Sequence, residues 1–133
     1  MVSYFLKKAT EIQPSQLYLN AAKLAKVKEL YKPISLDSLP PIPIKELDNE
    51  IIFIDGHHRA YVAVTFGFEK LPVYWESDAN LNLDLYRVCI NWCKSENIVS
   101  VLDLRNKIVK NTDFKKLWIK KCSDLKKEMK ISD

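Results

Sequence analysis

The spacing of apolar residues changes near residue 80 of the chain. Before that point they stand in short runs, IIFI at 51–54 and LPVYW at 71–75, of the kind that forms buried strands. After it they recur every three or four residues, as on one face of a helix. One stripe contains Leu85, Val88, Cys89 and Trp92, and a second contains Phe114, Leu117, Trp118, Cys122, Leu125 and Met129. This pattern predicts an α+β fold in which a small mixed sheet is followed by a helical C-terminal part.

Local signals predict further elements in the first half of the chain. Residues 20–32 should form a helix that Asn20 caps, because Leu24, Val27 and Tyr31 then fall on one face. The proline-rich stretch 33–49 should be an extended connector that ends in a short edge strand at 42–47, since proline cannot donate to a ladder. Residues after 57 have helical spacing up to Gly67, which suits a left-handed C-cap.

Capping residues also mark the helices of the second half. Ser100, followed three residues later by Asp103, resembles a capping box, and Thr112 is expected to cap the last helix. The three tryptophans have apolar neighbours, which favours core packing over a base-stacking surface. We therefore expect all three to be buried: Trp75, Trp92 and Trp118.

Length and composition fit one globular domain. The chain has 133 residues, of which 47% are hydrophobic and 29% are charged. An apolar run of about 18 residues, which a membrane-spanning helix needs, does not occur, and the N-terminus does not read as a signal peptide. Three cysteines, an odd number, suit a reducing compartment better than a disulfide framework. These features predict a cytoplasmic protein.

Positive charge is concentrated near the C-terminus. The whole chain carries a net charge of +4, yet the segment from Arg105 to Lys130 has ten Lys or Arg residues against three Asp or Glu. Such a segment can attract nucleic acid or another polyanion, here through the region Lys107–Lys127. Lysines without interleaved arginine or glycine are also common on solvated helix faces, and we give that interpretation more weight.

The most chemically equipped stretch is DGHHR, residues 55–59, between a predicted strand and a predicted helix. A helix start has unpaired N–H groups and a partial positive charge, so it can hold an anion such as phosphate. Gly56 allows a tight turn and lets a ligand approach the backbone, and Arg59 can grip a phosphate with two N–H groups. Gly67 ends the same helix, so the chain's only two glycines bracket it.

The other residues of the motif suggest catalytic roles. Asp55 stands where a carboxylate can bind Mg²⁺ or accept a proton from a hydroxyl nucleophile. His57 and His58 can shuttle protons or bond a phosphate oxygen. A simpler alternative is that Asp55 only caps the helix and that Arg59 pairs with a nearby acid.

Cys89 and Cys93 are four residues apart on a predicted helix and therefore share a face. With His57 and His58 they have the residue types of a zinc site. Buried thiols that act as small hydrophobic groups are the better interpretation, because no second close pair of ligands is seen.

The segment from Ile42 to Trp75 resembles the ParB/sulfiredoxin-like family, also described as ParB-like nuclease domains. FIDGHHRAYVAVTFGFEKLPVYW has that family's order of strand, compact motif ending in arginine, helix, glycine and strand. IQPSQLYLNAAKLAKVKEL also resembles the family's N-terminal strand and first helix. The resemblance implies a ParB/sulfiredoxin-like core at 1–80, with a helical extension at 81–133 packed on the same domain.

Within that family the motif is most similar to the free-serine kinases, which also have Asp-Gly-His-x-Arg. This similarity implies that Asp55, Gly56, His57 and Arg59 handle nucleotide phosphate, metal and substrate hydroxyl. It also implies ATP or ADP, with Mg²⁺, as cofactors. Sulfiredoxins have a cysteine at the position of His57, so we do not expect sulfinic acid repair from this chain.

Two functional hypotheses follow. In the first, the protein binds a nucleotide and transfers phosphoryl from ATP or ADP to a small hydroxylated substrate such as a free amino acid. Gly56, His57, His58 and Arg59 would hold the phosphate, and Asp55, His57 and His58 would be the catalytic groups. In the second, the protein is a non-catalytic ParB-like module whose basic C-terminal helices bind DNA or a protein partner.

Overall fold

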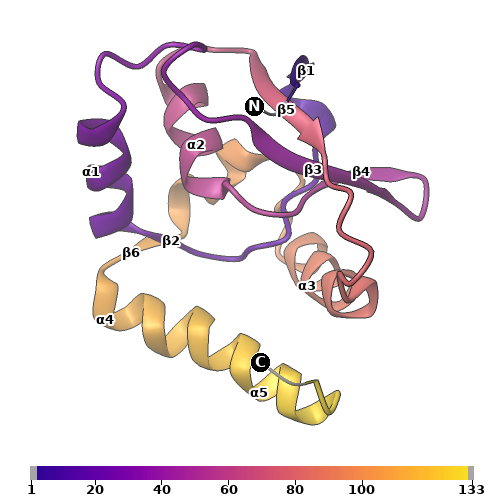
Figure 1. The fold of residues 1–133 in the computed structure, drawn as a ribbon. Helices are drawn as coiled ribbons and strands as arrows, with labels where there is room; N and C mark the ends of the chain where they lie inside the picture. The colour runs from indigo at the N-terminus through magenta and orange to yellow at the C-terminus, as the bar shows by residue number, and fades with distance from the viewer. Residues whose placement is uncertain (1–2, 132–133) are drawn as a thin grey trace.

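The computed structural model describes residues 3–131 and has the α+β fold that the sequence predicts (Figure 1). A four-stranded sheet has the order β1-β5-β3-β4, and a second sheet pairs β2 with β6. The strands are β1 (Phe5–Lys8), β2 (Leu19–Asn20), β3 (Ile42–Leu47), β4 (Glu50–Phe53), β5 (Lys70–Trp75) and β6 (Ile108–Val109). The α-helices are α1 (Ala21–Leu30), α2 (His57–Thr65), α3 (Leu83–Ser95), α4 (Asn111–Phe114) and α5 (Lys120–Glu128). Two 3₁₀ helices, η1 (Ala9–Glu11) and η2 (Val101–Asn106), and a π-helical stretch, η3 (Lys115–Ile119), complete the chain.

Strand β3 lies inside the sheet, parallel to β5 and antiparallel to β4. The expectation that residues 42–47 form an edge strand is therefore wrong. Pro43 is tolerated because of its position at one end of the pairing with β4, which begins at Ile44. The Pro43 carbonyl accepts a hydrogen bond from the Ile54 N–H at 3.0 Å. Since the N and C=O of a strand residue point to the same side, the missing N–H of Pro43 faces the end of β4, where the ladder stops.

The N-terminal segment covers the free edge of β4. The Gln13 N–H donates to the Ile51 carbonyl at 2.8 Å, and the Phe53 N–H donates to the Gln13 carbonyl at 3.0 Å. The Gln13 side chain continues past the sheet, and its Nε2 donates to the Ile98 carbonyl at 2.9 Å. One residue thus ties the sheet edge to the C-terminal part.

Helix α2 is largely buried. Ala60, Val62 and Ala63 are completely inaccessible to solvent, as are the sheet residues Ile44 and Val73. The helix ends as predicted: Gly67 has a φ of +98°, and the Phe68 N–H returns to the Ala63 carbonyl at 3.2 Å. This packing fixes the start of α2, and with it residues 55–59, relative to the sheet.

The C-terminal helices confirm one predicted cap and correct another. The Ser100–Asp103 capping box is present at the start of η2. The last helical segment begins at Asn111, so Thr112 is inside it and does not cap it. Residues 111–128 run continuously through α4, η3 and α5. This run contains the π-helical turn η3, and Leu117 within it is 42% exposed, outside the predicted buried stripe.

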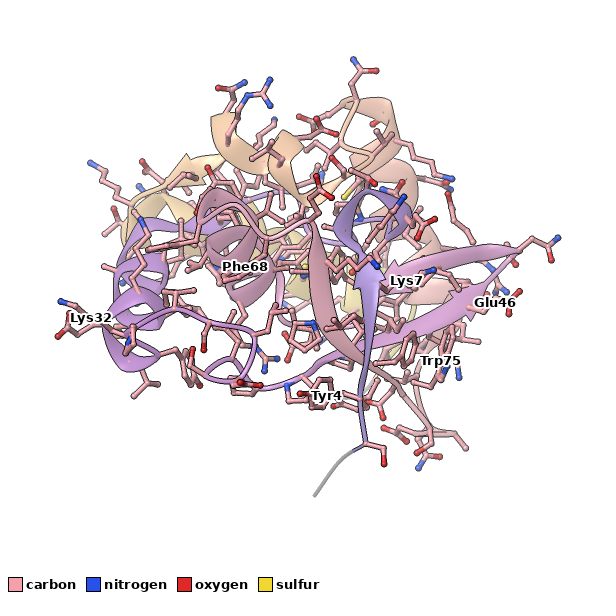
Figure 2. All side chains as sticks on the ribbon, turned by 90° about the horizontal axis from the view of Figure 1, so that it is seen from above. Tyr4, Lys7, Lys32, Glu46, Phe68 and Trp75 are labelled. Carbon is pink, nitrogen blue, oxygen red and sulfur yellow. The ribbon has the colours of Figure 1, made fainter. Side chains whose placement is uncertain are left out.

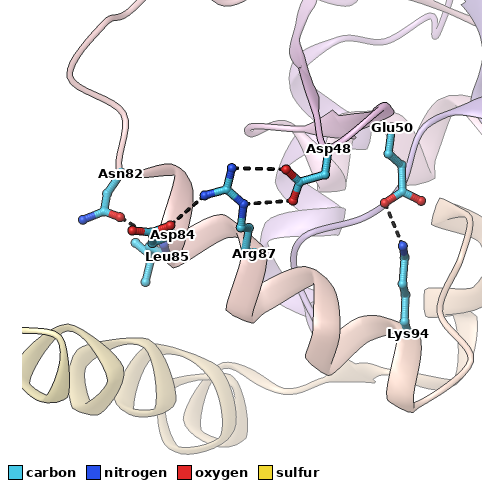
Figure 3. A network of polar contacts seen from close by, with 7 residues as sticks. All are labelled: Asp48, Glu50, Asn82, Asp84, Leu85, Arg87 and Lys94. Atoms are coloured by element: carbon cyan, nitrogen blue, oxygen red, sulfur yellow. Dashed lines mark hydrogen bonds and ion pairs between the residues drawn. The ribbon is translucent and has the colours of Figure 1, made fainter.

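Ion pairs join α3 to the β3–β4 hairpin (Figure 3). Arg87 binds Asp48 of the hairpin at 2.9 Å and Asp84 of its own helix at 2.6 Å, and Lys94 binds Glu50 of the hairpin at 2.7 Å. These side chains are largely exposed, so solvent screens the pairs. The burial of Cys89, Ile90 and Cys93 is therefore the larger contribution to the placement of α3. 

The tryptophans divide between core and surface. Trp118 is buried, and its ring meets that of half-buried Trp92 edge to face, with centroids 6.2 Å apart. Trp75 is 52% exposed and lies at the outside of the molecule (Figure 2). Its ring leans against that of Phe5 in the short edge strand β1, with centroids 5.6 Å apart. The expectation of a buried Trp75 is thus wrong: Trp75 is the last residue of β5, and the contact with Phe5 leaves half of it accessible to solvent. No helix within residues 3–131 has the length and apolarity needed to span a membrane.

Candidate functional site

Gly56 forms the junction between β4 and α2. Its φ is +80°, a left-handed conformation that strongly favours glycine. A Cβ at this position would stand 2.9 Å from Arg59 Nη2 and 3.0 Å from Ile42 Cγ2. The backbone conformation therefore favours glycine, and an added methyl group would also press on Ile42 and displace the end of the Arg59 side chain, which lies directly against the turn.

No side chain caps the start of α2. The Asp55 carboxylate accepts a hydrogen bond from the Gly56 N–H at 2.8 Å, which is outside the helix. The alternative in which Asp55 is only a helix cap is therefore not what the structure shows. In the described part of the chain the first N–H groups of α2 have no side-chain acceptor, and they form the positive end of the helix dipole.

Arg59 is held by backbone carbonyls. Its Nη1 donates to the carbonyls of Pro40 and Pro41 at 3.2 and 3.3 Å. Within residues 3–131 it has no carboxylate in ion-pair distance, so the alternative of a pair with a nearby acid is also absent. The proline-rich connector thus orients the guanidinium, whose charge remains available to an anion.

A cleft of about 280 Å³ lies between α1 and the start of α2. Lys23 and Lys26 reach it from α1, and Asp55 and Arg59 from the motif. Neither lysine ammonium group has a hydrogen-bond or ion-pair partner among the described residues. Three cations against one carboxylate make the cleft attractive to anions. Its complete lining is Lys23, Lys26, Val27, Leu30, Tyr31, Asp55, Gly56, His58 and Arg59.

Lys23 and Lys26 could not be recognised as site residues from the apolar pattern of α1, which marks only its buried face. The two lysines are three residues apart and so share the exposed face of that helix. Their spacing is a weak signal by itself. Its meaning depends on the packing of α1 beside α2, which is a tertiary contact.

His58 is a neutral hydrogen-bond acceptor that also lines the cleft. Its Nε2 accepts the Asn20 N–H at 2.9 Å, and its ring lies 6.1 Å from that of Phe114. Burial, with a smaller effect from Lys23, lowers the pKa of His58 to about 4. The ring is therefore uncharged at neutral pH. With Nε2 accepting, the ring proton is on Nδ1, which makes His58 a donor of one N–H group.

His57 points away from that cleft. Its Nε2 accepts the Ser15 N–H at 3.0 Å, and the ring lines a second cavity together with Tyr86, Cys89 and Cys122. Burial lowers the pKa of His57 to about 3 and outweighs the opposing effect of Asp55. Its Nδ1 is buried without a hydrogen-bond partner in the described part of the chain. At neutral pH both rings are therefore in the uncharged imidazole form. The sequence suggests that they shuttle protons, and in this form neither ring can act as an imidazolium acid.

The cleft fits Mg²⁺ only in the company of phosphates. Asp55 is the one carboxylate in its lining, and residues 3–131 contain no group of three His, Cys, Asp or Glu side chains that can hold a metal. Protein sites often bind Mg²⁺ through one or two carboxylates, substrate phosphates and water. Cys89, Cys93 and the two histidines do not form a metal cluster in this region.

The other candidate surfaces are less suited to binding an anion. Several lysines of the basic C-terminal region are engaged: Lys107 pairs with Glu96, Lys120 pairs with Asp124, and Lys121 lies over the Trp92 ring at 4.1 Å. A depression of about 390 Å³ at the far end of α2 includes Val64, Gly67 and Phe68 but no cluster of cations. 

Comparison with known proteins gives no family. No family model matches the chain, and no curated protein matches it. Among solved structures, the chain is similar to protein Atu1540 from Agrobacterium tumefaciens, with a TM-score of 0.45 and 13% identity. The similarity covers 72% of this chain and 49% of Atu1540, so the chain spans about half the length of that protein.

Proposed function

We propose that this chain is a phosphate- and nucleotide-binding protein of the ParB/sulfiredoxin-like type. On this view the cleft between α1 and α2 takes the phosphates of ATP or ADP. One observation carries the proposal: Lys23, Lys26 and Arg59 converge beside an uncapped helix start, and none of the carboxylates in residues 3–131 is in ion-pair distance of them. Isolated surface cations are usually solvated or paired, whereas a convergent unpaired set is what a bound anion requires.

The size of the cleft limits what it can enclose. Small-molecule sites usually have volumes of roughly 300–1,000 Å³, so a cleft of about 280 Å³ suits the phosphates better than a whole nucleotide. Val27, Leu30 and Tyr31 give its outer wall an apolar surface for part of the base or ribose. Gly56 allows the phosphate to approach the backbone, and His58 adds one neutral N–H donor.

Phosphoryl transfer to a small hydroxylated substrate, such as a free amino acid, is the catalytic form of the proposal. Asp55 is exposed and is held by the Gly56 N–H, which suits a base that accepts the hydroxyl proton. Mg²⁺, when bound with the phosphates, would neutralise their charge, with Asp55 as its protein ligand. A cytoplasmic location, where ATP is available and thiols stay reduced, belongs to the proposal.

The test is a thermal-shift panel of ATP, ADP, CTP, GTP and inorganic phosphate, each with and without Mg²⁺. A ligand that binds only the folded state raises the melting temperature by mass action. Arg59→Ala also removes the bonds to Pro40 and Pro41, so Lys23→Ala with Lys26→Ala is the cleaner change. With each exposed lysine contributing about 0.5–1 kcal/mol, the double variant should bind about tenfold more weakly.

Lys28→Ala is the matched control, because Lys28 is on the same helix but does not line the cleft. Its nucleotide-induced shift should equal that of the wild type. No shift of the wild-type protein with any nucleotide or with phosphate would refute the proposal. In that case salt-dependent binding of DNA to the region Lys107–Lys127 is the next measurement, since the non-catalytic alternative requires it.

A further inference from the structure

Two cysteines from different helices meet in the second cavity, away from the anion cleft. Cys89 of α3 and Cys122 of α5 both line this cavity of about 200 Å³, and each thiol shifts the pKa of the other. Trp92 of α3 meets Trp118 of η3, the stretch that runs on into α5, edge to face. The two thiols thus share one cavity, although 33 positions separate them in the sequence.

The two thiols have unequal environments. Cys122 is half-buried, and the neighbouring Cys89 thiol, together with Lys126 and Lys121, lowers its pKa. Cys89 is buried, and the Cys122 thiol and this burial raise its pKa. The greater exposure of Cys122 and the two lysines near it favour Cys122 as the attacking sulfur and the buried Cys89 as the one that reacts second.

We propose that Cys89 and Cys122 form an oxidant-reactive dithiol site that takes a small hydroperoxide and closes to an intramolecular disulfide. The cavity has room for such a molecule, since a water takes a volume of about 30 Å³. This site is separate from the phosphate-binding function and does not depend on it.

The reaction is balanced between the two thiols and one peroxide. The Cys122 thiolate attacks the O–O bond, which breaks to give a sulfenic acid and a hydroxide that takes up a proton. The Cys89 sulfur then displaces the sulfenic hydroxyl, which leaves as water with the Cys89 proton, and the S–S bond forms. Two electrons pass from the two sulfurs to the peroxide.

Cys93 is an internal control on the same helix as Cys89. It is fully buried, and burial raises its pKa to about 12. It also does not line the cavity that Cys89 and Cys122 share. If peroxide oxidised any cysteine of this chain equally, Cys93 would react as readily as Cys89 and Cys122.

The experiment treats the folded full chain with hydrogen peroxide and measures its intact mass under non-reducing conditions. The wild type and Cys93→Ser should each lose the mass of two hydrogen atoms, and digestion should give a peptide pair linked through Cys89 and Cys122. Cys122→Ser should not form the link. In Cys89→Ser, dimedone should label Cys122 as a sulfenic acid.

Three results would overturn the proposal. The first is a wild-type protein that keeps both thiols while free glutathione in the same tube is oxidised. The second is a linkage that requires Cys93. The third is dimedone labelling of Cys89 in Cys122→Ser with none of Cys122 in Cys89→Ser, which would reverse the assigned roles. Circular dichroism of each variant keeps a folding defect from being mistaken for lost reactivity.

Discussion

The two buried histidines should make the fold sensitive to mild acid. Each ring accepts a backbone N–H of the N-terminal segment through Nε2, His57 from Ser15 and His58 from Asn20. Protonation would replace each of these acceptors by a donor in a buried position. The pKa of His57 is lowered to about 3 and that of His58 to about 4, against an ordinary value of 6.5.

The direction and size of the effect follow from proton linkage. Because both pKa values are lower in the folded state, the unfolded chain binds protons first as the pH falls through 6.5. The stabilisation is complete above pH 6.5 and is lost progressively toward the folded pKa values. At pH 5 each histidine lowers the free energy of unfolding by about 2 kcal/mol relative to neutral pH, so the pair lowers it by about 4 kcal/mol. That is a large part of the roughly 5–15 kcal/mol by which a domain is stable.

The assay is urea unfolding followed by tryptophan fluorescence at pH 7.5, 6 and 5. His57→Gln with His58→Gln is the informative comparison, because a glutamine oxygen can accept the same N–H but does not titrate in this range. The double variant should lose about 4 kcal/mol less stability than the wild type between pH 7.5 and 5. Equal losses in the two proteins would refute the reasoning. So would a proton NMR titration of the folded wild type that gives either histidine a pKa above 6.

Two further predictions concern packing, and both are read out as urea midpoints. Gly56→Ala should destabilise the protein more than Gly67→Ala. Both glycines have a positive φ, which costs alanine about 1–2 kcal/mol, but only at Gly56 does an added Cβ meet neighbouring atoms. Equal losses of stability in the two variants would mean that the turn at Gly56 has room for a methyl group. Trp118→Ala should cost about 3–5 kcal/mol because Trp118 is buried, whereas its neighbour Leu117, which is 42% exposed, should tolerate alanine with a small loss. The reverse order would place the wrong face of the helix in the core.

The parts of the fold that depend on residues close together in the sequence could be predicted. Asn20 caps α1 as expected, accepting the Ala22 N–H at 2.9 Å, and Gly67 ends α2 in a left-handed conformation. The place of β3 inside the sheet could not be predicted in this way. It depends on pairing with β5, from which it is separated by the whole of α2. Pro43 suggested an edge strand because the local rule does not account for where the β4 ladder stops.

The candidate site shows the same limit. The motif at 55–59 predicted the turn, the helix start and the position of Arg59. It did not predict that Lys23 and Lys26 face the motif, because that depends on how α1 packs. Nor did it predict that the two histidines hold Ser15 and Asn20, which are 42 and 38 residues away in the sequence. In the sequence His57 and His58 look equivalent, but in the structure they line different cavities.

Selective labelling with ¹⁵N-glycine tests the central claim most directly. The chain has only two glycines, so the amide spectrum contains two signals. Gly56 lines the anion cleft and Gly67 follows the other end of α2, roughly 15 Å away along the helix axis. Titration with ADP or ATP and Mg²⁺ should move the Gly56 signal in a saturable way and leave Gly67 in place. If the Gly56 signal does not move, or if both signals move equally, the cleft at the start of α2 is not the nucleotide site.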